Sequence, residues 1–284
     1  MLVSRRCRSS FAELRKSKAS KTKPNNNMPR VAQASKTPNP ASKYFEWAGG
    51  NNGGHISYYD KSAVNPETKK AGVNVLVKLP FAFIVIGITS TIKGWHDGSD
   101  SAIYSNEVKD TVGEPLVVKA FDGGVLATGF YSAIRDRVAA AGGRFTSNIY
   151  LAYRDAGVMK IGCLQLHGAS LNSWVEFKNA SGDAIWKKAV GITSYKEGKK
   201  GSIVYRTPVF TLKDVSTESD DAAGVLQEQL AKYHTEYFAR TRTEAAQAPA
   251  NPAEAPRGGH PAEAPQDDSW GGEPEAPPAD DQAF

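Results

Sequence analysis

The segment GVNVLVKLPFAFIVIGITSTIKGW, residues 72–95, is the most strand-like part of the chain. β-branched residues are dense around Pro80 and Gly87, and such residues favour strands over helices. We read the segment as one long bent strand or two short ones. Its longest apolar run, residues 81–88, is far shorter than the about 20 residues with which a helix crosses a bilayer. The sequence therefore predicts a β-rich protein without a membrane partner, and we expect it in the cytoplasm.

Further β-like runs lie on the C-terminal side of this segment. The run EPLVVKAF precedes a DGG turn, and SNIYLAYR and VMKIGCLQL flank DAG, which is a hairpin signal. A second hairpin, with the basic tip KEGKKG, is expected between the last two runs. These patterns predict strands over residues 114–121, 147–154, 158–166, 183–198 and 201–212.

Three segments predict helices instead. Ile134, Val138 and Ala141 share one helical face, and the glycine pair that follows them ends the helix. Trp174 and Phe177 belong to an apolar stripe, so we expect them in the core. The third segment begins with acidic residues, which suit a helix N-terminus. The predicted helices are residues 130–141, 169–179 and 219–238.

The resulting order, β-β-α-β-β-α-β-β-α, defines the expected fold class. Strands that are close together in sequence favour a small, mostly antiparallel sheet or barrel, and no alternating βαβ pattern predicts a parallel sheet. We therefore expect a mainly β fold with helices (α+β). An OB-like antiparallel barrel with helical insertions fits the order and the loops.

Charge divides the chain into three parts. Residues 1–43 carry eleven Lys or Arg and one acid, and residues 244–284 carry nine acids and one base. Both ends are poor in large apolar residues, so we expect them to be disordered. The predicted organisation is a basic arm (1–43), an OB-fold-like domain (44–242) and an acidic Pro/Ala-rich tail (243–284). Two alternatives concern the arm: it has the composition of an organellar transit peptide, and Met28 is a second candidate start.

Motifs for catalysis or metal binding are missing from the sequence. It holds no phosphate-binding G-x-x-x-x-G-K-[ST] loop, no H-E-x-x-H and no G-x-S-x-G. The five His are scattered, Cys7 is far from Cys163, and Cys163 lies in an apolar run as a small core residue. We therefore expect no enzyme, no cofactor and no metal, while a site built from distant residues stays an alternative.

Aromatic and basic residues alternate through the middle of the chain. Binding of single-stranded nucleic acid uses this mixture, because rings stack on unpaired bases while Lys and Arg follow the phosphates. Strand alternation places Tyr153 in the core, and Tyr150 and Arg154 with Asn148 on the opposite face, where a base has room to stack. The candidate nucleic-acid-binding residues are Tyr58, Tyr59, Lys61, Trp95, Tyr150, Arg154, Trp186, Lys187, Lys188, Tyr195, Lys199, Lys200, Tyr205 and Arg206.

The last residues of the tail form a second candidate site. The chain ends PPADDQAF, which places Asp280 and Asp281 shortly before Phe284. A terminal ring suits a hydrophobic pocket, and the neighbouring carboxylates suit a basic rim. The tail is therefore expected to bind a partner protein.

Together these features resemble the single-stranded-DNA-binding proteins of bacteria and tailed phages. The pieces that carry the resemblance are YFEWAGG, GGHISYYDK, YSNEV, GASLNSW and VYRTPVF, within residues 44–210, and the ending DDQAF. The resemblance implies an OB-fold core that coats unpaired strands during DNA replication, recombination and repair. It also implies that the tail recruits replication proteins such as a polymerase or helicase, and that a phage-encoded chain works in the host cytoplasm. A homo-oligomer is possible in this class.

Two other functions stay open on sequence grounds. One is an RNA-binding or organellar nucleic-acid-binding protein that uses the arm as a targeting signal. The other is a virion structural or assembly protein whose charged ends recruit partners.

Overall fold

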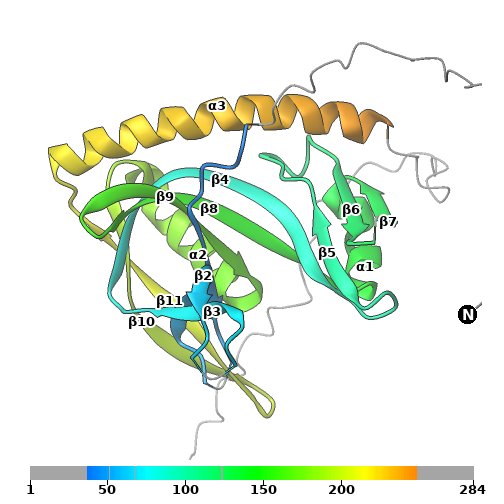
Figure 1. Cartoon of the computed structure of the whole chain (residues 1–284), viewed down its shortest axis with the longest axis horizontal. Helices are drawn as coiled ribbons and strands as arrows, with labels where there is room; N and C mark the ends of the chain where they lie inside the picture. The colour runs from blue at the N-terminus through cyan, green and yellow to red at the C-terminus, as the bar shows by residue number, and fades with distance from the viewer. Residues whose placement is uncertain (1–36, 51, 67, 123, 248–284) are drawn as a thin grey trace, which may run out of the picture. The chain divides into compact units, whose positions relative to one another are not determined.

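The computed structural model of the chain describes residues 37–247 except 51, 67 and 123 (Figure 1). Most of the predicted arm and tail, including Asp280, Asp281 and Phe284, lies outside the described residues. Eleven strands and three α-helices make up the described part. In chain order they are β1 (Lys43–Ala48), β2 (His55–Val64), β3 (Ala71–Val77), β4 (Phe81–His96), β5 (Ser101–Ser105), β6 (Leu116–Ala120), β7 (Val125–Gly129), α1 (Tyr131–Ala140), β8 (Gly143–Asp155), β9 (Val158–His167), α2 (Gly168–Ser181), a 3₁₀-helix (Gly182–Trp186), β10 (Ala189–Lys200), β11 (Ile203–Lys213) and α3 (Thr217–Gln247).

The segment 72–95 forms two strands, and the second one organises the sheet. Pro80, which has no backbone N–H to donate, separates β3 from the 16-residue strand β4. The start of β4 pairs with β10, its middle with β8 and its end with β5. A register shift between Val85 and Gly87 marks the bend in β4. Of the two readings of this segment, two strands is the correct one, but the second strand is long and bent rather than short.

The strands form one open mixed sheet, not the closed antiparallel barrel that the sequence suggested. The order is β3-β2-β1-β9-β8-β4-β5-β6-β7, with β10 paired to β4 and to β11. All pairs are antiparallel except β1 with β9. Because β1 occupies the edge of β9, β11 has no ladder with β9 among the described strands. Instead, the Arg206 N–H of β11 donates a single hydrogen bond to the Gly49 carbonyl, at 2.7 Å.

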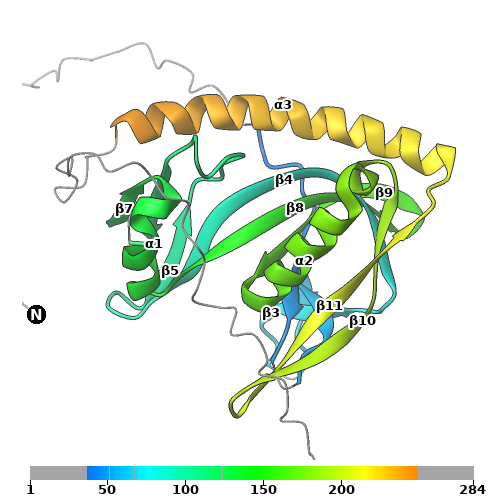
Figure 2. The same cartoon turned by 180° about the vertical axis from the view of Figure 1, so that it is seen from behind.

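The inner face of the sheet carries the main core. Phe45 and Trp47 of β1 point into it, together with alternate residues of β4, β8, β9 and β10. Helix α2 lies against β8, β9 and β11 (Figure 2) and buries Trp174 in this core. Trp174, Tyr153 and Phe177, which the sequence assigned to the core, all belong to this cluster, with Phe177 partly buried. Cys163 is fully buried, as expected.

Helix α3 covers part of the outer face. In Figure 1 it runs along the top of the sheet, where Ala223, Leu230 and Tyr233 pack on Ile84 and Cys163 from the strands below. The helix is longer than its sequence pattern predicted, so the expected domain boundary after residue 242 falls inside it. No described helix is both long and apolar enough to cross a membrane.

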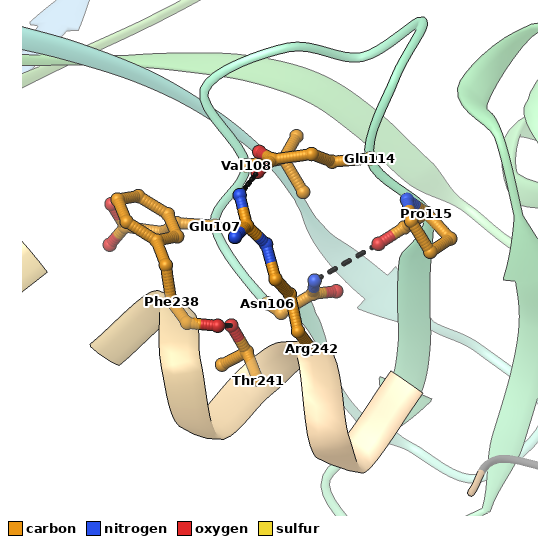
Figure 3. Close-up of a pocket in the computed structure, with 8 residues that line it drawn as sticks. All are labelled: Asn106, Glu107, Val108, Glu114, Pro115, Phe238, Thr241 and Arg242. Carbon is orange, nitrogen blue, oxygen red and sulfur yellow. Dashed lines mark hydrogen bonds and ion pairs between the residues drawn. The ribbon is translucent and has the colours of Figure 1, made fainter. Parts of the chain in front are cut away.

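The C-terminal half of α3 contacts a segment that is inserted between β4 and β8. The insertion consists of β5, β6, β7 and α1 and has its own small core. Figure 3 shows where the loop between β5 and β6 meets α3: Arg242 Nη2 bonds Glu114 Oε1 at 2.7 Å beside a cavity of about 180 Å³. Burial opposes ionisation of Glu114, but Arg242 and two backbone N–H groups outweigh it and lower the pKa of this carboxyl.

All three predicted helices and one predicted hairpin are confirmed, while the second hairpin differs in its turn. The β8–β9 hairpin turns at Ala156 and Gly157, both with positive φ, at the predicted DAG. In the second hairpin, β10 continues to Lys200 and the turn lies at Gly201 and Ser202. The predicted tip KEGKKG is therefore strand up to Lys200, because these residues pair with β11 rather than forming a loop.

A buried polar network lies between α3 and the sheet. The Tyr150 hydroxyl donates to the Glu107 carboxylate at 3.0 Å, and Thr89 Oγ1 donates to the same group at 2.6 Å. The backbone N–H of Glu107 donates to the hydroxyl of Tyr237 on α3, at 2.7 Å. His234 of α3 packs against the Tyr150 ring, and among the described residues its Nε2 atom has no hydrogen-bond partner.

His234 makes the stability of the fold sensitive to acid. Burial, with a smaller contribution from Lys109, lowers the pKa of His234 from 6.5 to about 4. Between these values the unfolded chain binds a proton that the folded chain does not. The contribution of neutral His234 to the free energy of unfolding is therefore fully present above pH 6.5. It is lost as the pH is lowered from 6.5 to about 4, and the loss amounts to about 2–3 kcal/mol.

Urea unfolding at several pH values between 7 and 4 measures this dependence. His234→Phe, which keeps an apolar ring in the same place, is expected to flatten it by that amount. An unchanged pH profile in the variant would mean that other groups cause the acid sensitivity.

Candidate nucleic-acid interface

Two adjoining cavities hollow the surface where β1 and β2 meet β9 and the C-terminal end of β4. Their volumes are about 740 and 410 Å³, and both are lined by Glu46, Lys93 and Gln165. We call the joined cavities the cleft. The larger one reaches towards β2, and the smaller one reaches the end of β4 at Trp95 and the start of β8 at Arg144.

Strand register builds the floor of the cleft. Gln165 of β9 pairs with Glu46 of β1 on one side and with Asn148 of β8 on the other. Paired residues project from the same face of a sheet, and the Gln165 amide accordingly donates to Asn148 Oδ1 at 2.9 Å. The Lys93 ammonium donates to Gln165 Oε1. The floor is therefore polar and fixed by hydrogen bonds.

Exposed aromatic rings stand along the cleft. Tyr59 is 56% exposed, Trp95 is 52% exposed and Tyr44 is 40% exposed. Large aromatic side chains are usually much more buried in a folded protein. Tyr44 lines the larger cavity, with its ring 5.9 Å from the Lys93 ammonium, and burial raises the pKa of its hydroxyl. The rings at the ends of the cleft are thus free to stack on a ligand.

The basic residues that line the cleft are of two kinds: some form salt bridges and others do not. Lys43 and Lys160 form salt bridges with Asp155, at 3.3 and 2.9 Å. By contrast, Lys93 and Arg144 have no carboxylate within salt-bridge distance among the described residues. The acids Glu46, Asp60 and Asp97 also line the cleft, so the cleft's positive charge outside salt bridges in the described residues lies at Lys93, Arg144 and the exposed Lys61.

His167 lies in the smaller cavity, near Arg144 and Lys93. Its pKa is lowered from the usual value first by burial and then by the nearby Arg144, with a further contribution from Lys93. Glu46 opposes this change. Burial, the largest cause, disfavours a charge of either sign, so only the smaller contributions of Arg144 and Lys93 reflect nearby positive charge.

Four of the residues that the sequence proposed for nucleic acid meet at the cleft. Tyr58, Tyr59 and Lys61 line the larger cavity, and Trp95 lines the smaller one. Tyr58 is half-buried, with the Lys43 ammonium 4.4 Å from its ring centroid. Tyr59 and Trp95 therefore offer the larger free ring surface.

Tyr150 contradicts the prediction, because it is fully buried. The alternation of β8 was read correctly, since Tyr150 and Tyr153 lie in clusters on opposite faces. The exposed face that the pattern implied is covered by α3, which packs on Tyr150. Burial raises the pKa of the Tyr150 hydroxyl strongly, with Glu107 adding to the effect. Arg154 is exposed but donates to the Gly157 carbonyl and to Ser219 near the start of α3.

The β10–β11 hairpin brings together a second group of proposed residues. Tyr195, Lys199, Lys200, Tyr205 and Arg206 all belong to it, and none lines the cleft. The Arg206 guanidinium donates to Glu197 at 3.2 Å and to the Gly53 carbonyl at 3.0 Å, and it lies 5.0 Å from the Tyr195 ring centroid. Its donors thus attach the hairpin to the β1–β2 loop, so Arg206 has a structural contact in this fold.

Arg206→Ala is therefore expected to lower the free energy of unfolding by about 1–3 kcal/mol, because it leaves the Gly53 carbonyl and Glu197 without their donor. Thermal unfolding measures the change, and Glu197→Gln should cost less. Unchanged stability together with weaker DNA binding would return Arg206 to the binding role.

Trp186, Lys187 and Lys188 form a third group, at the end of the 3₁₀-helix. All three are exposed, and Lys188 forms a salt bridge with Asp214 at 2.9 Å. They line neither cavity of the cleft. The structure thus separates the proposed residues into one cluster at the cleft and two clusters elsewhere.

Sequence reasoning missed Tyr44, Lys93 and Arg144. Lys93 and Trp95 are two positions apart on one strand, so they share a face. That spacing was a usable signal. Nothing in the sequence placed Arg144 beside them, because their pairing across β4 and β8 depends on the register of the whole sheet.

Comparisons with protein-family models, with curated proteins and with solved structures find no match to this chain. Within the described residues, no group of three or more His, Cys, Asp and Glu side chains is arranged to hold a metal ion.

Proposed function

We propose that this chain binds single-stranded DNA in the cleft. One observation carries the proposal: exposed Tyr59 and Trp95 rings stand at the two cavities, which are also lined by Lys93 and Arg144, two cations in no salt bridge among the described residues. Rings stack on unpaired bases and contribute about 1–3 kcal/mol per base, while the cations bind the backbone. The polar floor suits a hydrated, anionic ligand better than an apolar one.

The order of the central elements supports the position of this site. Strands β4, β8 and β9, then α2, then β10 and β11 follow the order of a five-stranded OB-type unit with one helix, and β4 pairs with both β8 and β10. OB folds bind oligonucleotides on the face of their second and third strands. In this chain those strands correspond to β8 and β9, which form the floor of the cleft. We propose the OB-type relationship on this basis, with β1 lying where direct closure would occur.

A wider role follows from the charge of the two ends. We propose that the protein coats unpaired strands during replication, recombination and repair, and that it acts by binding rather than by catalysis. The acidic tail, ending in Asp280, Asp281 and Phe284, would recruit a replication protein such as a polymerase or helicase. A free acidic segment suits this task, because the like charge of DNA keeps it from the bound strand.

Titration with poly-dT tests the binding proposal. Tryptophan fluorescence should be quenched as Trp95 stacks, and the affinity should fall steeply between two salt concentrations as counterions are released. Trp95→Phe should lose most of the quenching but keep most of the affinity. Absence of binding at low salt would overturn the proposal, and clearly tighter binding of poly-U than of poly-dT would favour the RNA-binding alternative.

A further inference from the structure

The surface beyond the cleft continues onto the insertion, whose outward residues match the chemistry of the cleft. We propose that strands β5 and β6 form an additional DNA subsite, made by Tyr104 and Lys119, that holds nucleotides beyond those in the cleft. This inference rests on the proposed function and extends it from one cleft to a longer track. It assigns the insertion a role in setting the length of strand that the protein covers.

The register of four strands defines the track. Arg144 of β8 is paired with Lys93 of β4, and Lys93 is paired with Tyr104 of β5. Tyr104 is in turn paired with Lys119 of β6. Directly paired residues point to the same face, so these four side chains form one row. With neighbouring strands about 4.8 Å apart, the row spans roughly 14 Å.

Buried residues on the opposite face of β5 and β6 fix the direction in which the side chains of the row point. Ile103 and Val118, each adjacent in sequence to a residue of the row, are buried in the small core of the insertion. Since side chains alternate along a strand, burial of these two turns Tyr104 and Lys119 outward. The subsite is thus part of a packed sheet and not of a loop.

The two new residues are available to a ligand. Tyr104 is 42% exposed, and no other described aromatic ring stacks on it. Lys119 has no carboxylate within salt-bridge distance among the described residues. Trp95 of β4 is paired with Ala102 of β5, whose side chain is only a methyl group. The ring of Trp95 therefore keeps an open side towards the insertion.

Acidic residues limit the track on one side. Asp97 and Asp100 lie in the turn between β4 and β5, and Asp122 lies in the turn between β6 and β7. Both turns are at the same end of these antiparallel strands, because Ala120 is paired with Ile103. Repulsion of phosphates from this end favours a strand that crosses β4, β5 and β6 along the basic row.

Oligothymidylates of two lengths test the proposal. A short one of about 5 nucleotides fills the cleft, and a long one of about 15 nucleotides also reaches the insertion. The double variant Tyr104→Ala/Lys119→Ala should bind the short oligonucleotide as the natural protein does and the long one at least about 10-fold more weakly. Fluorescence anisotropy measures both affinities, and Lys232→Ala, which removes an exposed lysine on α3, is the control.

The outcomes separate this proposal from the proposed function. If the double variant binds the long oligonucleotide normally while Tyr59→Ala weakens it, the subsite is wrong and the cleft stands. If the natural protein binds neither oligonucleotide, the proposed function itself fails. An equal loss at both lengths in a variant with unchanged thermal stability would also overturn a separate subsite. Tyr104→Phe, which keeps the ring, should retain the affinity for the long oligonucleotide.

Discussion

Replacement of Trp95 and Tyr59 together by alanine is expected to weaken the binding of single-stranded DNA by at least about 30-fold. Each ring that stacks on a base contributes about 1–3 kcal/mol, and the two rings stand at separate cavities of the cleft. Their effects should therefore add. Because both side chains are about half exposed, the fold should lose little stability, and circular dichroism checks this.

Trp186→Ala is the matched control for this pair. Trp186 is 47% exposed, close to the 52% of Trp95, but it lies outside the cleft. Anisotropy titrations with a labelled oligothymidylate should give an affinity within about threefold of the natural protein, since no stacking contact is lost. If Trp186→Ala costs as much as Trp95→Ala, the cleft is not the principal site.

The second large effect concerns stability, at Tyr150. Tyr150→Ala should lower the free energy of unfolding by about 3–5 kcal/mol, because it empties a large buried site beneath α3. Tyr150→Phe keeps the ring and removes only the hydroxyl that donates to Glu107, so it should cost about 1–3 kcal/mol.

Denaturant unfolding measures both losses, and DNA binding by Tyr150→Phe separates the two possible roles of this residue. If Tyr150 is only structural, Tyr150→Phe should bind DNA with unchanged affinity at a temperature where the variant is folded. Weaker binding with full stability would instead support the stacking role that the sequence suggested for Tyr150.

Local patterns in the sequence predicted much of the fold. The dense β-branched residues before and after Pro80, the DAG turn and the apolar face of 130–141 each depend on neighbours in sequence, and each corresponds to an observed element. The same kind of reasoning found Tyr59 and Trp95, because a ring beside a basic residue on a strand is a local feature.

Long-range pairing explains what the sequence did not predict. The parallel pairing of β1 with β9 left the sheet open, and no local sequence pattern predicts this pairing. The burial of Tyr150 has the same origin, since α3 returns over β8 from the far end of the chain. Arg144 and Lys93 likewise meet only through the β4–β8 register. The sequence predicted which side chains share a face of a strand, but it did not predict which other element covers that face.

The place of β1 also affects how the chain can fold as it is synthesised. The hydroxyl of Ser42, the residue before β1, donates to the carbonyl of Ile161, 119 positions further along. At about 5–20 residues per second, a ribosome needs on the order of ten seconds to complete this partner. Until then β1 can pair only with β2, which pairs in turn with β3, and Phe45 and Trp47 lack most of the surroundings that later bury them. The nascent chain therefore passes through an interval in which these two rings are available to a chaperone.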